Sequence, residues 1–299
     1  TDNVPRETST SNKVVGTRRL KEPMPAPAKG RIFVVANQKG GVGKTTTTVN
    51  IAAALSMGGL KVLVVDLDPQ GNASTALGVE HRVNMGVYEV LMGNAQVKDV
   101  IQKCAGFPVL DCISSNTSLA QAEINLVSMV ARESRLKDAL NEIKDNYDYI
   151  FIDCPPSLGL LTVNAFSAAT EVLIPIQCEY YALEGLSQLL ETYKIVKQRL
   201  NPDLTLSTIV LTMFDSRTRL ANDVVANVRS HFPRELIDTP IPRAVRLSEA
   251  PSYSQTVMTY DPSSTGAVAY MQVAREIAER GKAFDSNVVS INYKSGDIA

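Results

Sequence analysis

A glycine-rich loop with two lysines carries the clearest chemistry in this chain. Residues 39–46 read Lys-Gly-Gly-Val-Gly-Lys-Thr-Thr, and Gln38 stands where an ordinary phosphate-binding loop has its first glycine. Glycines permit backbone angles that are closed to other residues, so successive N–H groups of such a loop can surround phosphate oxygens. Lys44 can then bring a positive charge to the β and γ phosphates of a nucleotide, while Thr45 offers a hydroxyl to Mg2+ at the start of a helix. The residues expected to bind nucleotide are Lys39, Gly40, Gly41, Val42, Gly43, Lys44, Thr45 and Thr46.

Carboxylates follow two further apolar runs. Residues 61–66 lead through Asp66 to Asp68, and residues 149–152 lead to Asp153. Ligands of open α/β sheets bind at the carboxyl ends of the strands, and an aspartate at such an end can hold the Mg2+ of an NTPase. Each aspartate alone is more often a turn residue or a helix cap. Together with the phosphate-binding loop, however, they predict one Mg-nucleotide site where three strands end.

The elements that must position these groups alternate along the chain. Strand-like apolar runs begin near residues 31, 61, 109, 149, 171 and 206. Helical stretches begin near residues 45, 131, 181, 219 and 265. Such alternation predicts an α/β fold in which a mainly parallel twisted sheet is covered by helices on both faces. With 299 residues and 44% hydrophobic content, the chain is long enough for one sizeable domain of this kind.

The two ends of the chain depart from this pattern. Residues 1–29 combine Thr, Ser, Asn, Pro and basic residues with few large apolar ones, which predicts a disordered extension. The basic cluster at residues 18–21 could contact DNA or acidic lipid, but so short a run favours a solvated tail. Residues 283–299 lose periodicity and are expected to form a loose tail, which leaves a single domain over residues 30–282.

Composition argues against several classes of protein. The chain contains no run near the ~18 apolar residues of a membrane span, so integral membrane association is not expected. Residues 1–29 also lack the apolar core of a secretion signal. The cysteines Cys104, Cys112, Cys154 and Cys178 do not have the spacing of a zinc site, and isolated thiols fit a reducing cytoplasm. A net charge of −1 predicts that a monomer binds DNA weakly.

Four motifs resemble the ParA/Soj chromosome-partitioning ATPases. They are the loop at 39–46, Asp-Leu-Asp-Pro-Gln-Gly-Asn at 66–72, Asp-Cys-Pro-Pro-Ser at 153–157 and Ile-Pro-Arg-Ala-Val-Arg-Leu-Ser-Glu-Ala-Pro at 241–251. The resemblance extends from about residue 30 to residue 282. The loop alone indicates the wider superfamily, which also contains MinD-like cell-division ATPases, nitrogenase iron protein-like reductases and metal-delivery ATPases. The motif at 241–251 is more specific to chromosomal ParA.

The resemblance implies a role for each matching residue. Lys39 would cross a dimer interface to the phosphates held by the other subunit, so that ATP is sandwiched in a homodimer. Lys39, Lys44 and Asp68 would form the catalytic set, in which Asp68 positions or polarises the attacking water. The residues of the Mg2+ site would be Thr45, Asp66 and Asp153. Hydrolysis, an in-line phosphoryl transfer to water, is expected to be slow until a ParB-type centromere-binding partner stimulates it.

Two smaller assignments also rest on the resemblance. Met213 and Pro242 lie where ParA relatives line the adenine pocket, although both residue types are also common in cores and turns. Residues 157–159 would form a loop that senses the γ phosphate and couples the nucleotide state to the dimer surface.

Non-specific double-stranded DNA is the other expected ligand. The candidate contacts are Arg217 and Arg219 at the start of a helix, together with Arg243 and Arg246 in the last motif. The sequence alone makes each an ordinary surface arginine, whereas the resemblance implicates Arg217 and Arg246 in sequence-independent DNA binding. Dimerisation would double the phosphate contacts and raise the affinity through counterion release. The protein is accordingly expected in the cytoplasm, associated with the nucleoid.

Two other functions use the same loop. A MinD-like membrane switch needs a basic amphipathic helix at the C-terminus, and residues 286–295 are short, polar and poor in lysine. An ATP-dependent reductase or metal carrier needs matched thiol ligands, which the cysteine spacing does not supply. The partitioning switch is therefore the preferred function.

Overall fold

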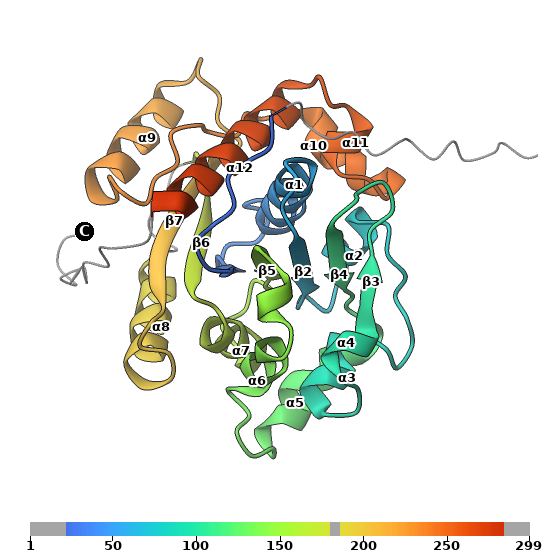
Figure 1. Cartoon of the computed structure of the whole chain (residues 1–299). Helices are drawn as coiled ribbons and strands as arrows, with labels where there is room; N and C mark the ends of the chain where they lie inside the picture. Colours follow the sequence, from blue (N-terminus) through green and yellow to red (C-terminus); the bar gives the residue numbers. More distant parts are fainter. Residues whose placement is uncertain (1–21, 180–185, 284–299) are drawn as a thin grey trace, which may run out of the picture.

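A mostly parallel β-sheet organises the protein. The computed structural model describes residues 22–179 and 186–283, and within them the sheet has seven strands in the order β3-β4-β2-β5-β1-β6-β7 (Figure 1). The bounds are β1 Arg31–Val35, β2 Val62–Asp66, β3 Ile101–Lys103, β4 Leu110–Ile113, β5 Tyr149–Asp153, β6 Glu171–Gln177 and β7 Thr205–Thr212. Neighbouring strands pair in parallel, except that β3 runs antiparallel to β4 at one edge. The mainly parallel sheet expected from the sequence is confirmed.

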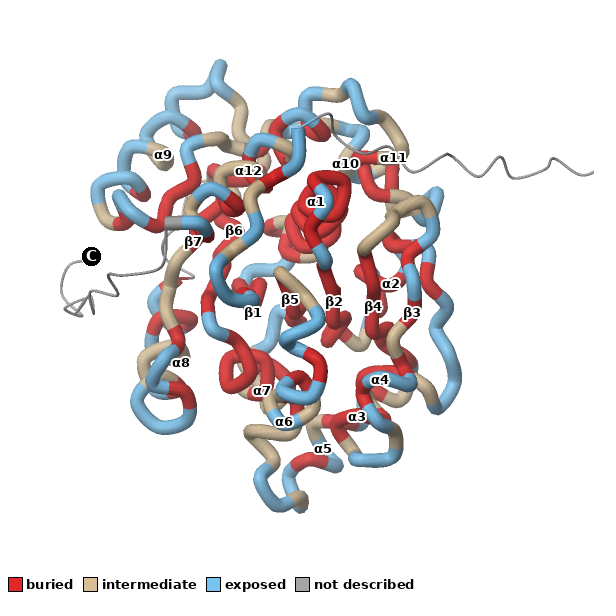
Figure 2. Tube along the Cα trace, in the orientation of Figure 1, coloured by how far each residue is buried: buried red, intermediate tan, exposed pale blue. Residues whose placement is uncertain are grey.

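Alternation along the strands divides the apolar core into two layers. Successive side chains of a strand point to opposite faces of the sheet. In β1, Ile32 and Val34 belong to one core cluster, whereas Phe33 and Val35 belong to the other. Phe33 stacks on Phe151 of β5, with 5.3 Å between the ring centroids. Because both faces are covered, the central strands are buried along their whole length, as Figure 2 shows.

Helices cover both faces of this sheet. Helices α1, α2, α11 and α12 pack on the face that carries Phe33, and α3 to α9 contribute to the core on the other face (Figure 1). The α-helix bounds are α1 Lys44–Met57, α2 Asn72–Ala76, α3 Val87–Met92, α4 Val97–Val100, α5 Ala122–Val127, α6 Arg135–Asn141, α7 Leu160–Ala168, α8 Leu186–Arg199, α9 Arg219–His231, α10 Val245–Glu249, α11 Val257–Tyr260 and α12 Thr265–Ala283. The 3-10 helices are η1 Thr117–Gln121, η2 Lys144–Asn146 and η3 Ala250–Tyr253. None of the described helices combines the length with the apolarity that spanning a bilayer requires.

Short elements account for most differences from the expected order. β3 was not expected, because only Gln102 of its three residues is buried and so short a strand shows no alternation. One helical stretch was expected near residue 131, but α2 to α6 fill that part of the chain with helices of four to seven residues. Such helices carry too few turns for a periodic pattern. The helix expected near residue 181 is α8, and residues 180–185 lie outside the described residues.

The domain begins earlier than the sequence indicated. Met24, which was expected in the disordered extension, is only 4% exposed, and its N–H donates to the Gly58 carbonyl at 3.0 Å. A Cβ atom on Gly58 would lie 2.7 Å from the Met24 side chain, so the glycine makes room for this contact. A single apolar residue among prolines carries no pattern that reveals such packing. Ala283, the first residue of the expected C-terminal tail, still belongs to α12. The remaining tail predictions, on residues 1–21 with their basic cluster and on residues 284–299, fall outside the described residues.

Candidate nucleotide-binding site

The phosphate-binding loop leaves β1 and enters α1. Gly41 and Gly43 have φ angles of +75° and +89°, in the left-handed region that favours glycine. A Cβ atom on Gly40 or Gly41 would meet nothing within 4 Å, so the rim of the loop is open to a ligand. The hydroxyl of Thr212, at the end of β7, donates to the Val42 carbonyl at 2.8 Å. This hydrogen bond fixes the loop to a strand that lies far away in the sequence.

Asp153 ends the central strand β5 and faces the start of α1. Thr45 Oγ1 donates to Asp153 Oδ2 at 2.7 Å, and Thr48 Oγ1 donates to Asp153 Oδ1 at 2.9 Å. Burial raises the pKa of Asp153 to about 7; the carboxylate of Asp66 adds to the increase, and the two hydroxyl hydrogen bonds oppose it. Carboxylate and hydroxyl oxygens beside a phosphate-binding loop are hard ligands of the kind that Mg2+ prefers. The residues present therefore fit this metal.

Asp66 is tied to the loop that carries Asp68. It ends β2 in register with Asp153 and is completely buried. Its carboxylate accepts hydrogen bonds from the Ser74 hydroxyl at 2.6 Å, the Ser74 N–H at 2.7 Å and the Asp68 N–H at 3.3 Å. Burial raises the pKa of Asp66 to about 6, although the hydrogen bonds from Ser74 oppose the increase. Asp68 itself is 8% exposed and accepts the N–H of Gln70 at 2.9 Å.

The two lysines of the loop have different surroundings. Lys44 is buried, and its Nζ lies 3.4 Å from the Lys39 carbonyl oxygen. Burial lowers the pKa of Lys44, while the charges of Asp153 and Asp68 act in the opposite direction. The side chain of Lys39 is 43% exposed, and its Nζ lies 3.8 Å from Glu179 Oε2. Lys44 is thus held near the carboxylates of its own site, whereas Lys39 reaches the surface.

A cavity of about 380 Å3 adjoins the loop. Its lining residues are Gly43, Thr46, Thr212, Met213, Ile241, Pro242, Arg243, Ala244, Val245, Leu247, Ser248 and Tyr270. Both residues expected at the adenine pocket, Met213 and Pro242, are among them. The Phe214 N–H donates to the Ile241 carbonyl at 2.9 Å and joins the two segments that supply these walls. Met213 has a φ of +53°, which is uncommon outside glycine. A largely apolar cavity of this size suits a purine base.

Arg217 and Arg219 lie at the entry to α9, as expected, and each faces a carboxylate of its own chain. The guanidinium of Arg217 donates to both carboxylate oxygens of Asp215, at 2.9 and 2.7 Å, while the side chain remains 87% exposed. These hydrogen bonds lower the pKa of Asp215 to about 2. Arg219 Nε lies 3.7 Å from Asp223 Oδ2 one turn further along the helix.

The other two arginines lie in different places. Arg246, in α10, pairs with Glu249 at 2.8 Å on the surface. Arg243 lines the cavity, and its guanidinium lies 3.3 Å from Glu179, the same carboxylate that Lys39 approaches. Arg243 is therefore placed beside the nucleotide loop, whereas Arg246 stands outside it.

Four polar residues of the site were not expected from the sequence: Thr48, Ser74, Glu179 and Thr212. Thr48 has a local signal, because it follows Thr45 by three residues on α1 and so lies on the same face of the helix. Ser74 lies two residues after the motif at 66–72. Glu179 and Thr212 meet the loop from separate segments, and their own neighbourhoods carry no motif.

Sequence comparisons find relatives over most of the chain. A family model described as an AAA domain matches residues 30–206. The chain is 53% identical over 253 residues to the sporulation initiation inhibitor protein Soj of Bacillus subtilis. The aligned region covers 84% of this chain and 100% of that protein. The chain is 48% identical over 252 residues to the chromosome partitioning protein ParA of Myxococcus xanthus, covering 84% of this chain and 89% of that protein.

Solved structures share the fold and the kind of ligand. A cobyrinic acid a,c-diamide synthase from Mycobacterium smegmatis, with bound ADP and magnesium, matches with a TM-score of 0.71 and 39% identity over 84% of this chain and 93% of that chain. The septum site-determining protein MinD of Pyrococcus horikoshii, complexed with Mg-ADP, matches with a TM-score of 0.66 and 26% identity. This match covers 83% of this chain and 96% of that chain. With this fold, this loop and these sequence relatives, the chain belongs to the ParA/Soj family of chromosome-partitioning ATPases, within the ParA/MinD superfamily.

Proposed function

We propose that this ATPase is a switch in which two copies close around two bound ATP molecules. The closed dimer binds DNA regardless of its sequence, and a ParB-type partner stimulates the hydrolysis that releases it. The observation that carries the proposal is the position of Lys39, which heads the phosphate-binding loop with a half-exposed side chain. Its ion pair with Glu179, 3.8 Å long and exposed, contributes only ~0–1 kcal/mol. Lys39 can therefore exchange this carboxylate for a phosphate in a second copy at little cost.

ATP and Mg2+ are the ligands of the site within each copy. The N–H groups of the loop and the ammonium of Lys44 hold the phosphates, and Thr45 and Asp153 hold Mg2+. When bound, Mg2+ neutralises charge on the phosphates. Asp68 orients the water that attacks the γ phosphorus as the bond to the leaving ADP oxygen breaks. Asp66, expected in the metal site, is already engaged by Ser74 and Asp68, so we assign it the task of holding Asp68 in place.

The cavity beside the loop is assigned to adenine, with Met213 and Pro242 in its walls. We also assign Arg243 to the nucleotide side, although the sequence suggested DNA, because it lines this cavity and pairs with Glu179.

DNA is assigned to Arg217, Arg219 and Arg246. Each has a carboxylate neighbour and the chain has a net charge of −1, so a phosphate must compete with an existing ion pair. A monomer should bind poorly for this reason. A dimer presents the contacts of two copies to one duplex, and every added contact raises the affinity through counterion release. Location on the nucleoid in the cytoplasm follows from this proposal.

Dimerisation is tested with Lys39→Ala and the matched control Lys98→Ala, which removes an exposed lysine on α4. Both variants are measured by size-exclusion chromatography with light scattering, in ADP and in a non-hydrolysable ATP analogue. We expect wild type and Lys98→Ala to dimerise with the analogue. Lys39→Ala should bind the analogue and remain monomeric. A dimer of undiminished stability in Lys39→Ala would remove Lys39 from the interface.

DNA binding is tested on a duplex of arbitrary sequence with ATP, ADP or no nucleotide, at two salt concentrations. Retention only with ATP, weakening at high salt, supports the switch. The double variant Arg217→Glu with Arg246→Glu should lose DNA while keeping the dimer, and normal DNA binding by it would place the contact elsewhere. Dimerisation without DNA binding by wild type would favour a MinD-like function, and binding to liposomes would then be measured.

A further inference from the structure

We infer that Arg280, on the last turns of α12, positions the DNA-contacting end of α9. It clamps the segment that follows α9 and thereby determines where Arg217 and Arg219 stand. The inference rests on the proposed DNA binding by these two arginines, and it gives α12 a part in that function.

Helix α9 packs on the core through a narrow apolar face. Of its 13 residues, Ala221 and Val228 are buried, and Val224 and Val225 are partly buried against the same core. Figure 2 accordingly shows most of α9 as exposed, in contrast to α1 in the centre of the molecule. A helix with so little buried surface depends on contacts at its ends for a defined position.

The loop that carries Arg217 is built onto the start of α9. The hydroxyl of Thr218 accepts the Ala221 N–H at 3.3 Å and caps the helix. The Asn222 side chain donates to the Ser216 carbonyl at 3.2 Å and to the Thr218 carbonyl at 2.8 Å. These bonds connect the loop to the first turns of the helix, so Arg217 moves with α9 when α9 moves.

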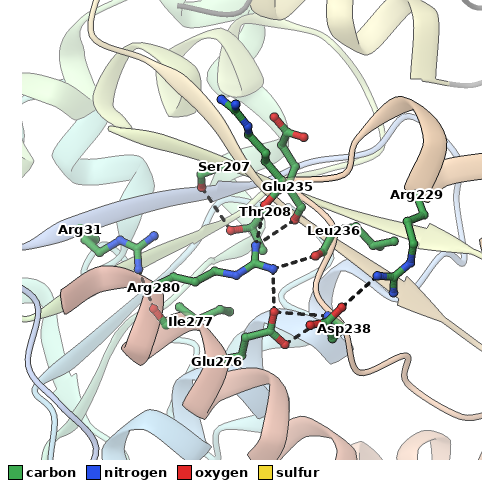
Figure 3. Close-up of polar contacts among 11 residues, drawn as sticks. Arg31, Ser207, Thr208, Arg229, Glu235, Leu236, Asp238, Glu276, Ile277 and Arg280 are labelled. Atoms are coloured by element: carbon green, nitrogen blue, oxygen red, sulfur yellow. Dashed lines mark hydrogen bonds and ion pairs between the residues drawn. The ribbon is translucent and has the colours of Figure 1, made fainter. Parts of the chain in front are cut away.

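Arg280 holds the segment that leaves the other end of α9 (Figure 3). Its Nη1 donates to the Arg234 carbonyl at 3.0 Å, and its Nη2 donates to the Leu236 carbonyl at 2.7 Å and to Glu276 at 2.6 Å. Glu276, one turn earlier on α12, accepts the Asp238 N–H at 3.1 Å. The two side chains form one clamp over residues 234–238. Arg280 is thereby directed into the protein and is not presented to DNA.

The clamp starts from an anchored part of α12. Arg31 on β1 forms a buried ion pair with Glu171 at 2.6 Å. Its Nη1 donates to the Ile277 carbonyl of α12 at 2.8 Å (Figure 3). A Cβ atom on Gly281 would lie 2.9 Å from Arg31 Nη1, so the glycine lets the helix approach the arginine closely. The turn that carries Arg280 is therefore fixed to the sheet. Through the clamp, residues 234–238 are held in a defined position relative to the sheet.

The clamped segment reaches α9 through an ion pair and is also attached to β7. Asp238 pairs with Arg229, in the last turn of α9, at 3.1 Å. The Ile209 N–H on β7 donates to the Glu235 carbonyl at 2.8 Å, and the Ile237 N–H donates to the Ile209 carbonyl at 2.9 Å. These two backbone bonds remain when Arg280 is replaced. Loss of the clamp should therefore loosen the position of α9 without unfolding the segment.

The geometry requires an arginine. A guanidinium presents five N–H donors in a planar fork and can bond carbonyls and a carboxylate in different directions at once. A lysine keeps the charge, but its compact ammonium cannot reproduce this arrangement. Arg280→Lys consequently removes the clamp and leaves the net charge of the protein unchanged.

The test measures binding of wild type and Arg280→Lys to a duplex of arbitrary sequence, with ATP, over a series of salt concentrations. Each phosphate contact adds about 0.9 to the slope of log affinity against log salt concentration. Over a tenfold change in salt, from about 1 M to about 0.1 M, one contact therefore accounts for about eightfold in affinity. Both copies of the dimer carry the substitution, so loss of one contact per copy removes two contacts per dimer. The slope should therefore fall by about 1.8 and the affinity at about 0.1 M salt by about sixtyfold. Dimerisation and basal ATP hydrolysis should stay at wild-type values.

The control is Arg275→Lys, which makes the same exchange at a half-buried arginine of α12 and should leave slope and affinity unchanged. An Arg280→Lys protein that melts earlier but keeps the wild-type slope and affinity would show a purely stabilising role and overturn the inference. An equal loss in both variants would also overturn it. If Arg280→Lys fails to fold, the variant Glu276→Gln is measured in its place. A smaller decrease of the salt slope is then expected, and an unchanged slope would count against the clamp.

Failure of the proposed function has a different signature. Wild type would then show no ATP-dependent retention on DNA, or the double variant Arg217→Glu with Arg246→Glu would bind DNA as wild type does. In either case the clamp has no DNA contact to position, and the inference falls with the proposal.

Discussion

Replacement of Asp153 by asparagine should remove a loss of stability that the wild-type protein undergoes as the pH rises, in the absence of Mg2+ and nucleotide, and at the same time abolish its ATPase activity. Asp153 is completely buried between Asp66 and the start of α1, and this environment raises its pKa from 3.8 to about 7. A carboxylate with a raised pKa binds its proton more tightly in the folded state than in the unfolded state. The free energy of unfolding therefore decreases as the pH rises from about 4 to about 7, where the buried group becomes charged, and then levels off.

The magnitude follows from the same shift. Each pH unit between the two pKa values lowers the free energy of unfolding by ~1.4 kcal/mol, so the full penalty approaches ~4 kcal/mol above pH ~7. Between pH ~5 and pH ~8 the penalty grows by about 2–3 kcal/mol. Asparagine carries no charge and escapes this penalty, whatever constant cost its different hydrogen bonds introduce. The stability of Asp153→Asn relative to wild type should therefore rise by that amount over this range.

The assay is urea unfolding followed by far-ultraviolet circular dichroism, because the chain contains no tryptophan for fluorescence. Wild type, Asp153→Asn and the control Asp99→Asn, which neutralises an exposed carboxylate on α4, are compared in EDTA at both pH values. Addition of Mg2+ and ATP should stabilise wild type more than Asp153→Asn. A stability difference between Asp153→Asn and wild type that is the same at both pH values would refute the reasoning, because the charge would then carry no burial penalty.

Three other outcomes are expected. Asp68→Ala should bind ATP and dimerise but release phosphate far more slowly than wild type, since the attacking water loses its orienting carboxylate; a wild-type rate of phosphate release would exclude that role. Asp215→Asn should raise duplex affinity, measured by fluorescence anisotropy with ATP, because Arg217 loses the carboxylate that occupies it, and unchanged affinity would mean that this arginine does not contact DNA. Met24→Ala should lower the free energy of unfolding by about 2–4 kcal/mol, as expected for a buried methionine, and a variant as stable as wild type would return residues 22–29 to the extension.

Contiguous residues made part of the fold and of the site predictable. The glycines and lysines at 39–46 lie next to one another, and the apolar runs before Asp66 and Asp153 are unbroken. A left-handed glycine, a buried strand and the aspartate after it each depend on neighbours in the chain, so the phosphate loop and the parallel sheet could be expected. The rule that ligands bind at the carboxyl ends of strands then brought the aspartates together.

Elements without such local patterns could not be predicted. β3 has three residues and was missed for that reason. The helices from α2 to α6 are too short for a periodic pattern, so a single helical stretch was expected in their place. The burial of Met24 could not be predicted either, because a single apolar residue forms no pattern and the space for its side chain is created by the distant Gly58.

The sequence by itself therefore determined which chemical groups this protein brings to its site: a phosphate-binding loop with two lysines, the aspartates that follow two apolar strands, and a parallel sheet to hold them. Only the tertiary structure decided which partners these groups have. It placed Glu179 beside Lys39, Ser74 on Asp66 and Arg280 against the segment behind α9. The physical reason is that hydrogen bonds and ion pairs act over a few ångströms in space, whereas the residues that make them lie far apart along the chain and leave no pattern in its order.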